Sequence, residues 1–234
     1  MLLCPLEFER RVLSSALRRR ERIDARPRSA VHVCGPGATG VRRWFEHLEP
    51  STSPTGGVLL VGTGGGLSRD LPAGVAVVAE RIVDADGRSS SPTLKPPPST
   101  RCGVILALDE PPTTPEAKRR QGERSGAVAV DLESAAFAEC CDARGWSWNV
   151  VRGISDGADH SLPPQVAAWI DPAGRLRHAA LLASLLRSPR TISMLPALRR
   201  RSRAALEAVA ETIAAWTTPP MSGVPDPCSL ASVR

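Results

Sequence analysis

The stretch Val130–Asp159, VDLESAAFAECCDARGWSWNVVRGISDGAD, places acidic residues directly after two apolar runs. Glu133 follows the run Ala127–Val130, and Asp156 follows the run Asn149–Val151. Short Val-rich runs predict buried strands, and the Ala-rich segment between them has helical spacing. Open α/β sheets bind ligands beyond the carboxyl ends of their strands. The stretch therefore predicts a strand–helix–strand unit with carboxylates at its ligand-binding edge.

These acidic residues lie between an apolar strand and an Ala-rich helix, where they are poor core material. This position favours a ligand-binding role. The alternative is that Asp131 or Asp156 only caps a helix N-terminus. Trp146 and Trp148 flank the second strand and are interpreted as packing residues before ligand contacts.

The same alternation recurs along the chain, with Val-rich runs predicting strands and three-and-four apolar spacing predicting helices. Besides the two strands above, the predicted strands are Ala30–Cys34, Gly57–Val61, Val75–Ala79 and Gly103–Leu108. The predicted helices are Glu7–Arg20, Thr39–Leu48, Thr114–Arg124, Leu132–Arg144 and Arg175–Leu186. Strands that alternate with helices predict an α/β layer fold.

Three further stretches complete the organisation. The Ser/Pro-rich stretch Arg88–Thr100 predicts an exposed loop without a regular element, and the composition of the tail from Thr217 predicts a frayed end. We expect one domain over residues 1–216 and a flexible tail over residues 217–234. Thr191–Trp216 predicts a helix with an apolar stripe and an Arg-rich opposite face. That helix either packs on the sheet or meets anionic lipid or an oligomer partner at the surface.

Composition excludes several classes of protein. With 42% hydrophobic and 23% charged residues, the 234-residue chain is neither wholly disordered nor collagen-like. The net charge of +6 is spread along the chain, and nearly all of the basic residues are Arg, with Lys only at 95 and 118. Three Phe, five Trp and no Tyr leave few rings for base stacking, so no nucleic-acid partner is expected.

The cysteines and histidines predict neither a metal site nor a cofactor, because the six cysteines form no CxxC pair and the four histidines have no ligand spacing. We expect reduced, buried thiols. No apolar stretch approaches the ~20 residues that span a bilayer, and Glu7 introduces charge too early for a signal peptide. A cytoplasmic location is expected, and peripheral membrane contact stays open.

Two glycine-rich stretches follow predicted strands. In Cys34–Gly40, CGPGATG, backbone N–H groups at Gly35 and Gly37 are placed to approach an anion or a sugar, the alternative being a tight turn. In Val61–Leu67, VGTGGGL, three consecutive glycines cost chain entropy. We expect a ligand to pass close to Gly64 and Gly65, with the neighbouring Thr63 offering a hydroxyl.

Two segments in register resemble one known family. VDLESAAFAECCDARGWSWNVVRGISDGAD is similar to the second half of the nucleoside phosphorylase and nucleosidase family, which contains bacterial methylthioadenosine/S-adenosylhomocysteine nucleosidase. That family carries V-x-M-E-x-x-A followed by R-x-I-S-D-x-A-D. GTGGGLSRDLPAGVAVVAE resembles its G-[ST]-A-G-G-L segment and the following strand. The resemblance runs from Glu7 to Trp216 and implies a three-layer αβα sandwich with a central mixed sheet.

Within that family, VDLES, ISDGADHSLPP and LPALRR resemble the hopanoid-associated branch, whose members release adenine from adenosylhopane. The resemblance therefore implies cleavage of the N-glycosidic bond of a purine nucleoside by water or phosphate. It implies no metal or redox cofactor. Members are commonly dimers or hexamers, so a homo-oligomer is expected.

The resemblance also implies roles for individual residues. Asp156 would protonate the leaving purine, and Glu133 would accept hydrogen bonds from the ribose hydroxyls over an apolar wall at Leu132. Glu9 would act as base or orient the attacking water. Thr63, Gly64, Gly65 and Ser155 are counted with the nucleoside-binding residues, and Gly35 and Gly37 with the anion loop.

Departures from the family pattern carry information too. Phosphorylases of the family hold phosphate with two arginines, and Thr39 and Leu60 stand in those places here. Without these guanidinium groups phosphate loses its bidentate partners, which favours water as nucleophile unless Arg42, Arg43 or Arg101 approaches from elsewhere. An S-G-D-x-F segment with an aromatic partner for the base is missing. A non-catalytic nucleoside-binding module is therefore the alternative function.

Overall fold

A mixed sheet runs through the centre of the computed structural model, which describes residues 1–24, 30–49, 51–163, 170–175, 177 and 190–217. Within these residues the strands are β1 (Leu2–Cys4), β2 (Val31–Val33), β3 (Val58–Gly66), β4 (Ala76–Val83), β5 (Ser89–Ser90), β6 (Cys102–Ala107), β7 (Ala129–Asp131) and β8 (Trp148–Asp156). The helices are α1 (Glu7–Asp24), α2 (Gly37–Glu46), α3 (Pro115–Ser125), α4 (Ser134–Ala143) and α6 (Arg190–Thr217).

Five strands close into a ring. β3 runs parallel to β8, β8 pairs antiparallel with β4, and β4 and β6 and then β6 and β7 pair in parallel. β7 returns to the far end of β3 in antiparallel pairing. Gly65 of β3 therefore has Val130 of β7 on one side and Asp156 of β8 on the other. The ring brings together the carboxyl ends of β3, β7 and β8, which are far apart in sequence.

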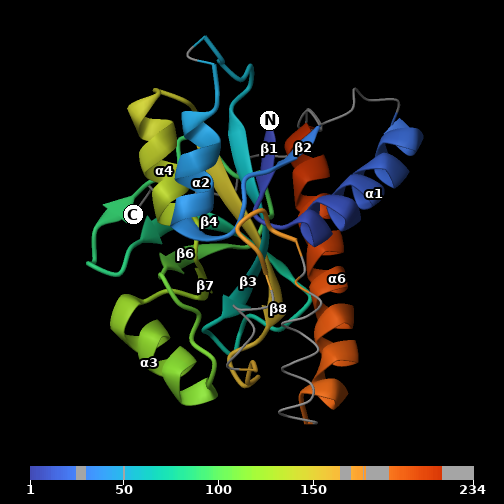
Figure 1. Ribbon diagram of the computed structural model, residues 1–234, viewed down its shortest axis with the longest axis vertical. Helices are drawn as coiled ribbons and strands as arrows, with labels where there is room; N and C mark the ends of the chain where they lie inside the picture. The colour runs from blue at the N-terminus through green and yellow to red at the C-terminus, as the bar shows by residue number, and fades with distance from the viewer. Residues whose placement is uncertain (25–29, 50, 164–169, 176, 178–189, 218–234) are drawn as a thin grey trace, which may run out of the picture.

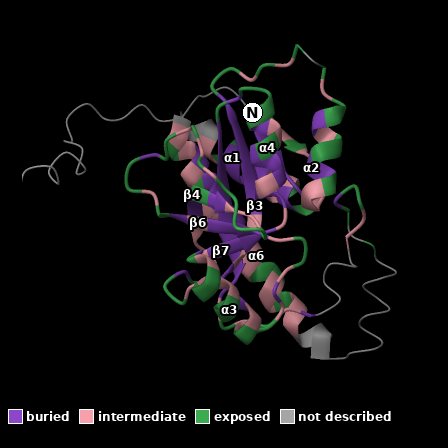
Figure 2. Ribbon diagram, turned by 90° about the vertical axis from the view of Figure 1, so that its left-hand side faces the viewer, coloured by how far each residue is buried: buried purple, intermediate pink, exposed green. Residues whose placement is uncertain are grey.

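Helices cover both faces of the sheet, as predicted (Figure 1). Successive residues of β3 show the alternation: Leu60 packs with α2 and α4, whereas Leu59 and Val61 pack with α1 and α6. A strand with apolar side chains on both faces is typical of a sheet buried between two helical layers. Figure 2 shows the buried strands inside a shell of helices with exposed outer faces. The expected three-layer α/β fold with a central mixed sheet is confirmed.

The C-terminal helix α6 packs on the sheet, which confirms the first of its two interpretations. Ala205, Val209 and Ile213 of the expected apolar stripe are buried, and they lie in the cluster that holds α1, β3 and β8 together. Gly153 of β8 makes this approach close, because a Cβ atom there would lie 2.5 Å from the carbonyl oxygen of Ala205. α6 therefore depends on a glycine in β8.

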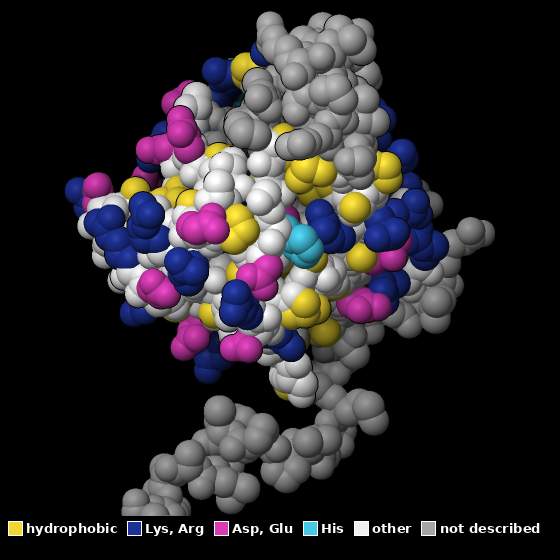
Figure 3. Space-filling model, turned by 90° about the horizontal axis from the view of Figure 1, so that it is seen from below, with side chains coloured by type: hydrophobic (Ala, Val, Ile, Leu, Met, Phe, Trp, Pro, Cys, Tyr) yellow, Lys and Arg dark blue, Asp and Glu magenta, His cyan; other side chains and the backbone are white. Residues whose placement is uncertain are grey.

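Ion pairs on α6 join one of its own arginines and one arginine of α1 to its glutamates. Arg203 pairs with Glu207 at 3.4 Å, and Arg20 of α1 pairs with Glu211 at 2.6 Å. In Figure 3, which shows the lower end of the molecule in Figure 1, Lys and Arg side chains are interspersed with Asp and Glu side chains. None of the described helices is long and apolar enough to cross a membrane. Peripheral membrane contact through α6 stays a prediction.

α3 lies beyond the carboxyl ends of the strands, and its bounds follow from local chemistry. The Thr114 side chain caps its first turn by accepting the N–H of Ala117 at 3.2 Å, and Pro115 opens the helix. Gly126 ends it in the left-handed conformation, with φ of 67°. The prediction of a helix at Thr114–Arg124 is confirmed within one residue.

Two predictions need correction. The predicted strand at Gly57–Val61 continues through the glycine-rich stretch to Gly66, so VGTGGG is part of β3 and not a loop after it. Its glycines permit the close spacing of strands in the ring, an effect that local composition does not reveal. Within Arg88–Thr100, Ser89 and Ser90 pair with β4 as β5, although no regular element was expected.

The remainder of that Ser/Pro-rich stretch is mostly exposed, as predicted, but it is tied to β8. The N–H of Leu94 donates to the carbonyl of Trp148 at 3.0 Å, and the Asn149 side chain donates to the carbonyl of Leu94 at 2.6 Å. Most of the helix predicted at Arg175–Leu186 lies outside the described residues, as does the tail over 218–234. The division into residues 1–216 and 217–234 stays a prediction.

Replacing Gly153 by Ala should destabilise the protein by ~1–3 kcal/mol, because the added methyl group meets the backbone of α6 and something must move. Urea unfolding followed by circular dichroism measures the change. Ala204→Ser, at an exposed position on α6, is the control and should stay within ~0.5 kcal/mol of wild type. Equal stability of the two variants would contradict the tight packing of α6 on β8.

Candidate functional site

A cavity of about 320 Å³ opens at the carboxyl ends of β3, β7 and β8. Its wall includes Glu9, Glu133 and Asp156, three carboxylates from α1, the start of α4 and the end of β8. The predicted residues Leu132, Thr63, Gly64, Gly65, Ser155 and Gly37 also line it. The tertiary structure therefore brings together residues that the sequence analysis took from four separate segments.

Glu9 lies in the first turn of α1 and is 1% exposed. Its Oε1 accepts the N–H and the hydroxyl of Thr63, both at 2.7 Å, and its Oε2 accepts the N–H of Leu6 at 3.1 Å. Burial raises the pKa of Glu9, and the bonds from Thr63 and the charge of Arg152 oppose that rise. The hydroxyl of Thr63, expected to face a ligand, donates to this carboxylate instead.

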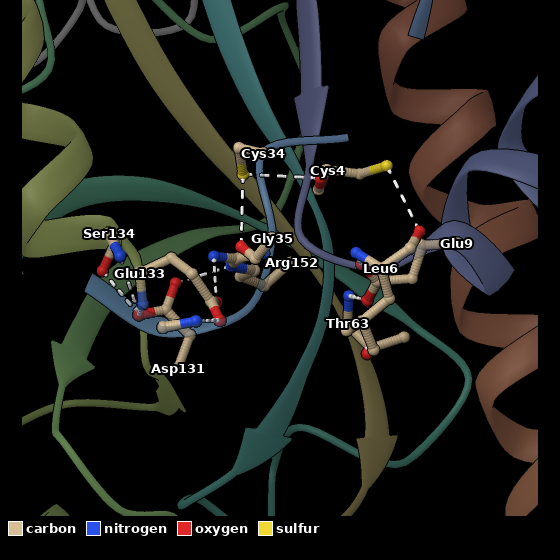
Figure 4. Close-up of polar contacts among 11 residues, drawn as sticks. Cys4, Leu6, Glu9, Cys34, Gly35, Thr63, Asp131, Glu133, Ser134 and Arg152 are labelled. Carbon is tan, nitrogen blue, oxygen red and sulfur yellow. Dashed lines mark hydrogen bonds and ion pairs between the residues drawn. The ribbon is translucent and has the colours of Figure 1, made fainter. Parts of the chain in front are cut away.

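Arg152 of β8 is a fully buried cation that joins two of the acidic segments (Figure 4). Its Nε donates to Asp131 at 2.6 Å, and its Nη2 donates to Glu133 at 3.0 Å. Its Nη1 is buried and has no hydrogen-bond partner within the described residues. A buried donor without a partner is costly, so Nη1 is a place where a water molecule or a ligand oxygen would gain a strong bond.

The free Nη1 of Arg152 lies near the carboxylate of Glu9, with Gly62 of β3 between them. A Cβ atom on Gly62 would lie 2.8 Å from Nη1 and 3.0 Å from both carboxylate oxygens of Glu9. Glycine is required at this position because any side chain would fill the space between the two groups. The polar groups that surround Gly62 thus explain why the second residue of the VGTGGG stretch is glycine.

Glu133 occupies the N-cap position of α4, so the helix begins at Ser134 and not at the predicted Leu132. Its Oε1 accepts the N–H of Gly37 at 2.8 Å. The pKa of Glu133 is raised to about 7, chiefly by burial, with the nearby charge of Asp131 adding to the rise and Arg152 opposing it.

In the loop expected to bind an anion, the N–H of Gly37 therefore donates a hydrogen bond to a carboxylate of the protein, that of Glu133. Gly35, the other predicted residue of that loop, is outside the cavity lining.

Asp131 and Asp156, the two residues for which helix capping was the alternative, have different roles. Asp131 accepts the N–H and the hydroxyl of Ser134, at 3.2 and 2.7 Å, and holds Arg152. Asp131 therefore caps the start of α4, but it does not only cap a helix, because it also pairs with Arg152 and lines the cavity.

Asp156 is the last residue of β8 and 3% exposed, and its carboxylate lies at the cavity. The hydroxyl of Ser155 donates to its Oδ1 at 2.6 Å, and the ammonium group of Lys118 donates to its Oδ2. Asp156 thus faces the cavity while it is held on both oxygens.

Arg152 and Lys118 are the residues that sequence reasoning missed. Each carried a signal: Arg152 interrupts an apolar strand, and Lys118 is one of two lysines in an Arg-rich chain. A charged residue inside an apolar run is expected to have a buried partner. The sequence singled out the partners Asp131, Glu133 and Asp156. It did not show that Arg152 and Lys118 pair with them.

Alternative cations proposed for phosphate do not reach the cavity. Arg42 pairs with Glu139 at 2.7 Å on the surface, and Arg101 donates to the carbonyl of Asp70 at 2.8 Å. Arg43 is exposed on α2. None of the described cavity-lining residues is Lys or Arg.

The cysteines and the aromatic residues also have structural explanations. Cys4, Cys34 and Cys141 are free and buried, as expected, whereas Cys102 is exposed and corrects that expectation. Trp146 and Trp148 are buried in the core, which confirms their interpretation as packing residues.

Comparison with known proteins agrees with the fold. The model of the Phosphorylase superfamily matches residues 90–187. No curated protein matches the sequence. The structure is similar to futalosine hydrolase of Helicobacter pylori, with a TM-score of 0.60 and 15% identity over 92% of this chain and 95% of that one.

Two nucleosidase structures are equally similar. The 5′-methylthioadenosine/S-adenosylhomocysteine nucleosidase of Helicobacter pylori has a TM-score of 0.60 and 16% identity over 92% of this chain and 95% of its own. The corresponding nucleosidase of Neisseria meningitidis, in complex with methylthio-immucillin-A, has a TM-score of 0.60 and 15% identity over 92% and 96%. The chain has the mixed α/β fold of these nucleosidase structures.

Replacing Glu133 by Gln should remove a pH dependence of stability. The pKa of Glu133 is about 7 in the folded protein against 4.5 for a free side chain, so the folded state binds this proton more tightly over that interval. Wild type should therefore lose stability, on the order of 2 kcal/mol relative to Glu133→Gln, as pH rises from about 4.5 to about 7.

Urea unfolding at several pH values measures this difference. The matched control is Glu139→Gln, an exposed position on the same helix α4, which should follow the wild-type pH dependence. If the two variants behave alike, Glu133 does not carry a raised pKa.

Proposed function

We propose that this protein cleaves the N-glycosidic bond of a purine nucleoside, with water as the nucleophile. One observation carries the proposal: three buried carboxylates, Glu9, Glu133 and Asp156, line one cavity, and each is held by different partners. The structural similarity to enzymes named nucleosidase and futalosine hydrolase agrees with this reaction.

The reaction requires stabilisation of a cationic sugar and protonation of the leaving base. Carboxylates at the ribose subsite meet the first requirement. Glu133 is placed to accept hydrogen bonds from the ribose hydroxyls, and its negative charge favours positive charge at C1′. Asp156, at the end of β8, is assigned to the base, where it protonates N7.

Glu9 and Arg152 fit the role of holding the attacking water. The water would donate one hydrogen bond to the carboxylate of Glu9 and accept one from the free Nη1 of Arg152. The raised pKa of Glu9 suits a general base, because a carboxylate of higher pKa takes up a proton more readily. This arrangement also explains why a buried guanidinium keeps one donor unused.

Water is favoured over phosphate for electrostatic reasons. A phosphate dianion would meet four acidic residues, Glu9, Asp131, Glu133 and Asp156, without a Lys or Arg among the described lining residues. Guanidinium groups are the strongest partners of phosphate, and their absence from this lining leaves the dianion without compensation. A neutral water molecule has no such cost.

The cavity favours a substrate with an apolar 5′ substituent. Its remaining wall is aliphatic, built from Pro5, Leu6, Pro36, Leu132, Leu162 and Ile170. Burial of a hydrocarbon group against such a wall contributes roughly 25 cal/mol per Å² of area removed from water. Adenosylhopane, implied by the sequence resemblance, is the substrate that we propose.

The direct test is adenine release from adenosine, methylthioadenosine, S-adenosylhomocysteine and adenosylhopane, each with and without inorganic phosphate. We expect release in phosphate-free buffer, with the highest kcat/KM for the most hydrophobic 5′ group. Strict dependence on phosphate would contradict water as the nucleophile. Binding of these nucleosides without base release would establish the alternative, a non-catalytic nucleoside-binding module.

Asp156→Asn should lower kcat for adenine release by ~10²–10⁴-fold while nucleoside binding is kept, because the amide has no carboxyl proton to deliver. Steady-state kinetics and a binding measurement on the same variant separate the two effects. Asp159→Asn, an exposed position paired with Arg69, is the control and should retain wild-type rates. Unchanged kcat in Asp156→Asn would remove Asp156 from the mechanism.

A further inference from the structure

Lys118 of α3 is fully buried, and its ammonium group contacts the end of β8. Its Nζ donates to Oδ2 of Asp156, to the carbonyl of Gly157 at 3.0 Å and to the carbonyl of His160 at 2.9 Å. All three contacts are to oxygen acceptors. Lys118 therefore has no donor left for a substrate and acts only through Asp156.

The number of acceptors determines the charge of the pair. Three oxygen acceptors require three N–H donors, which only the ammonium form of Lys118 provides. Asp156 accepts from the ammonium group of Lys118 on Oδ2, and the single proton of the Ser155 hydroxyl has the Oδ1 of Asp156 at 2.6 Å as its nearer acceptor and the carbonyl of Gly64 at 3.2 Å as its farther one. Asp156 is therefore a carboxylate in the empty site, and the proton required by the leaving base resides on Lys118.

The turn that holds Lys118 has its own support. The N–H of Gly157 donates to Nδ1 of His160 at 3.0 Å, which requires a neutral imidazole. Burial lowers the pKa of His160, with the charges of Arg201 and Lys118 adding to this effect and those of Asp156 and Asp159 opposing it. The two carbonyls that bind Lys118 thus belong to a turn fixed by an internal hydrogen bond.

Building on the glycosidic cleavage proposed above, we propose that Lys118 is the positioning residue of the leaving-group acid. It holds Asp156 ionised in the empty site and, through Asp156, supplies the proton that the departing purine takes up. Asp156 remains the catalytic residue because it is the group at the cavity.

The proton transfer balances as follows. The C1′–N9 bond breaks and its electron pair goes to the purine, which makes N7 basic. Nζ of Lys118 first gives a proton to the carboxylate of Asp156, and Asp156 passes that proton to N7, so an N–H bond is lost at Lys118 and one is formed at N7. After the purine leaves, water entering the cavity returns a proton to Lys118 through Asp156.

The geometry suits both protonation states of Lys118. A neutral amine has two N–H donors and one lone pair. The two donors match the carbonyls of Gly157 and His160, and while the transferred proton is on Asp156 the lone pair accepts a hydrogen bond from that carboxyl group. After Lys118 has lost the proton, both carbonyl groups of this turn therefore still accept a hydrogen bond from it.

The kinetic test compares wild type with Lys118→Met over a range of pH. In the variant, Asp156 must carry its own proton, and it does so only when the pH is low enough to protonate it. The wild-type to variant ratio of adenine release should therefore rise with pH, to ~10²–10⁴ at the alkaline end. Titration of Glu9 and Glu133, which face the cavity, occurs in both proteins and cancels in the ratio. The pKa of His160 rises in Lys118→Met because the charge of Lys118 lowers it in wild type, so the pH range over which His160 titrates is measured in both proteins.

Two controls separate this role from a structural one. Lys95→Met changes the chain's other lysine, which is exposed, and should match wild type at every pH. A p-nitrophenyl riboside needs no proton on its leaving group, so its ratio should stay within a few-fold and not vary with pH. A ratio for adenine release that does not vary with pH, or an equal change for both substrates, would overturn the proposal.

Infrared difference spectroscopy tests the charge of Asp156 without any substrate. Wild type minus Asp156→Asn should lack a protonated-carboxyl band at neutral pH, whereas Lys118→Met minus the double variant should contain one at acidic pH. A protonated-carboxyl band in the difference between wild type and Asp156→Asn at neutral pH would overturn the proposal, even where Lys118→Met does not fold. If wild type releases no base, the proposed function fails, and the spectrum alone still decides whether Lys118 keeps Asp156 ionised.

Discussion

The buried guanidinium of Arg152 is the interaction on which the site depends. Removal of such a cation from water costs several kcal/mol, and the loss is recovered only through well-placed carboxylates. Asp131 and Glu133 supply them from the start of α4, and Glu9 adds its charge from α1. Because these groups come from separate elements, the ion network joins α1, α4 and β8 in one arrangement.

The network also sets the chemistry of the carboxylates. Burial alone would raise the pKa of Glu9 and of Glu133 further, and Arg152 limits both increases. Glu133, with a pKa of about 7, can therefore bind hydroxyl groups or take up a proton near neutral pH. The same cation therefore stabilises the fold around the cavity and adjusts the acids that line it.

Two buried cations, Arg152 and Lys118, contact different carboxylates of the cavity wall. Arg152 pairs with Glu133, on the side where Glu9 also lies, and Lys118 pairs with Asp156 at the end of β8. Neither cation is among the residues that line the cavity, so the nucleoside meets carboxylates and aliphatic side chains, and Nη1 of Arg152 is left for the proposed water beside Glu9. This arrangement suits a neutral ligand that develops positive charge during reaction, and it disfavours an anion.

The sequence alone determined the layered α/β fold, because alternating apolar periods of strands and helices act locally. It also indicated Glu133 and Asp156, since carboxylates after buried strands have few other uses. The partners of Arg152 and Lys118 were decided only by tertiary structure. Ring closure of the sheet places Asp156 beside Gly65, and α3 places Lys118 beneath it, across 38 residues of chain. Pairings over such separations depend on how elements pack, and no local pattern of residues encodes them.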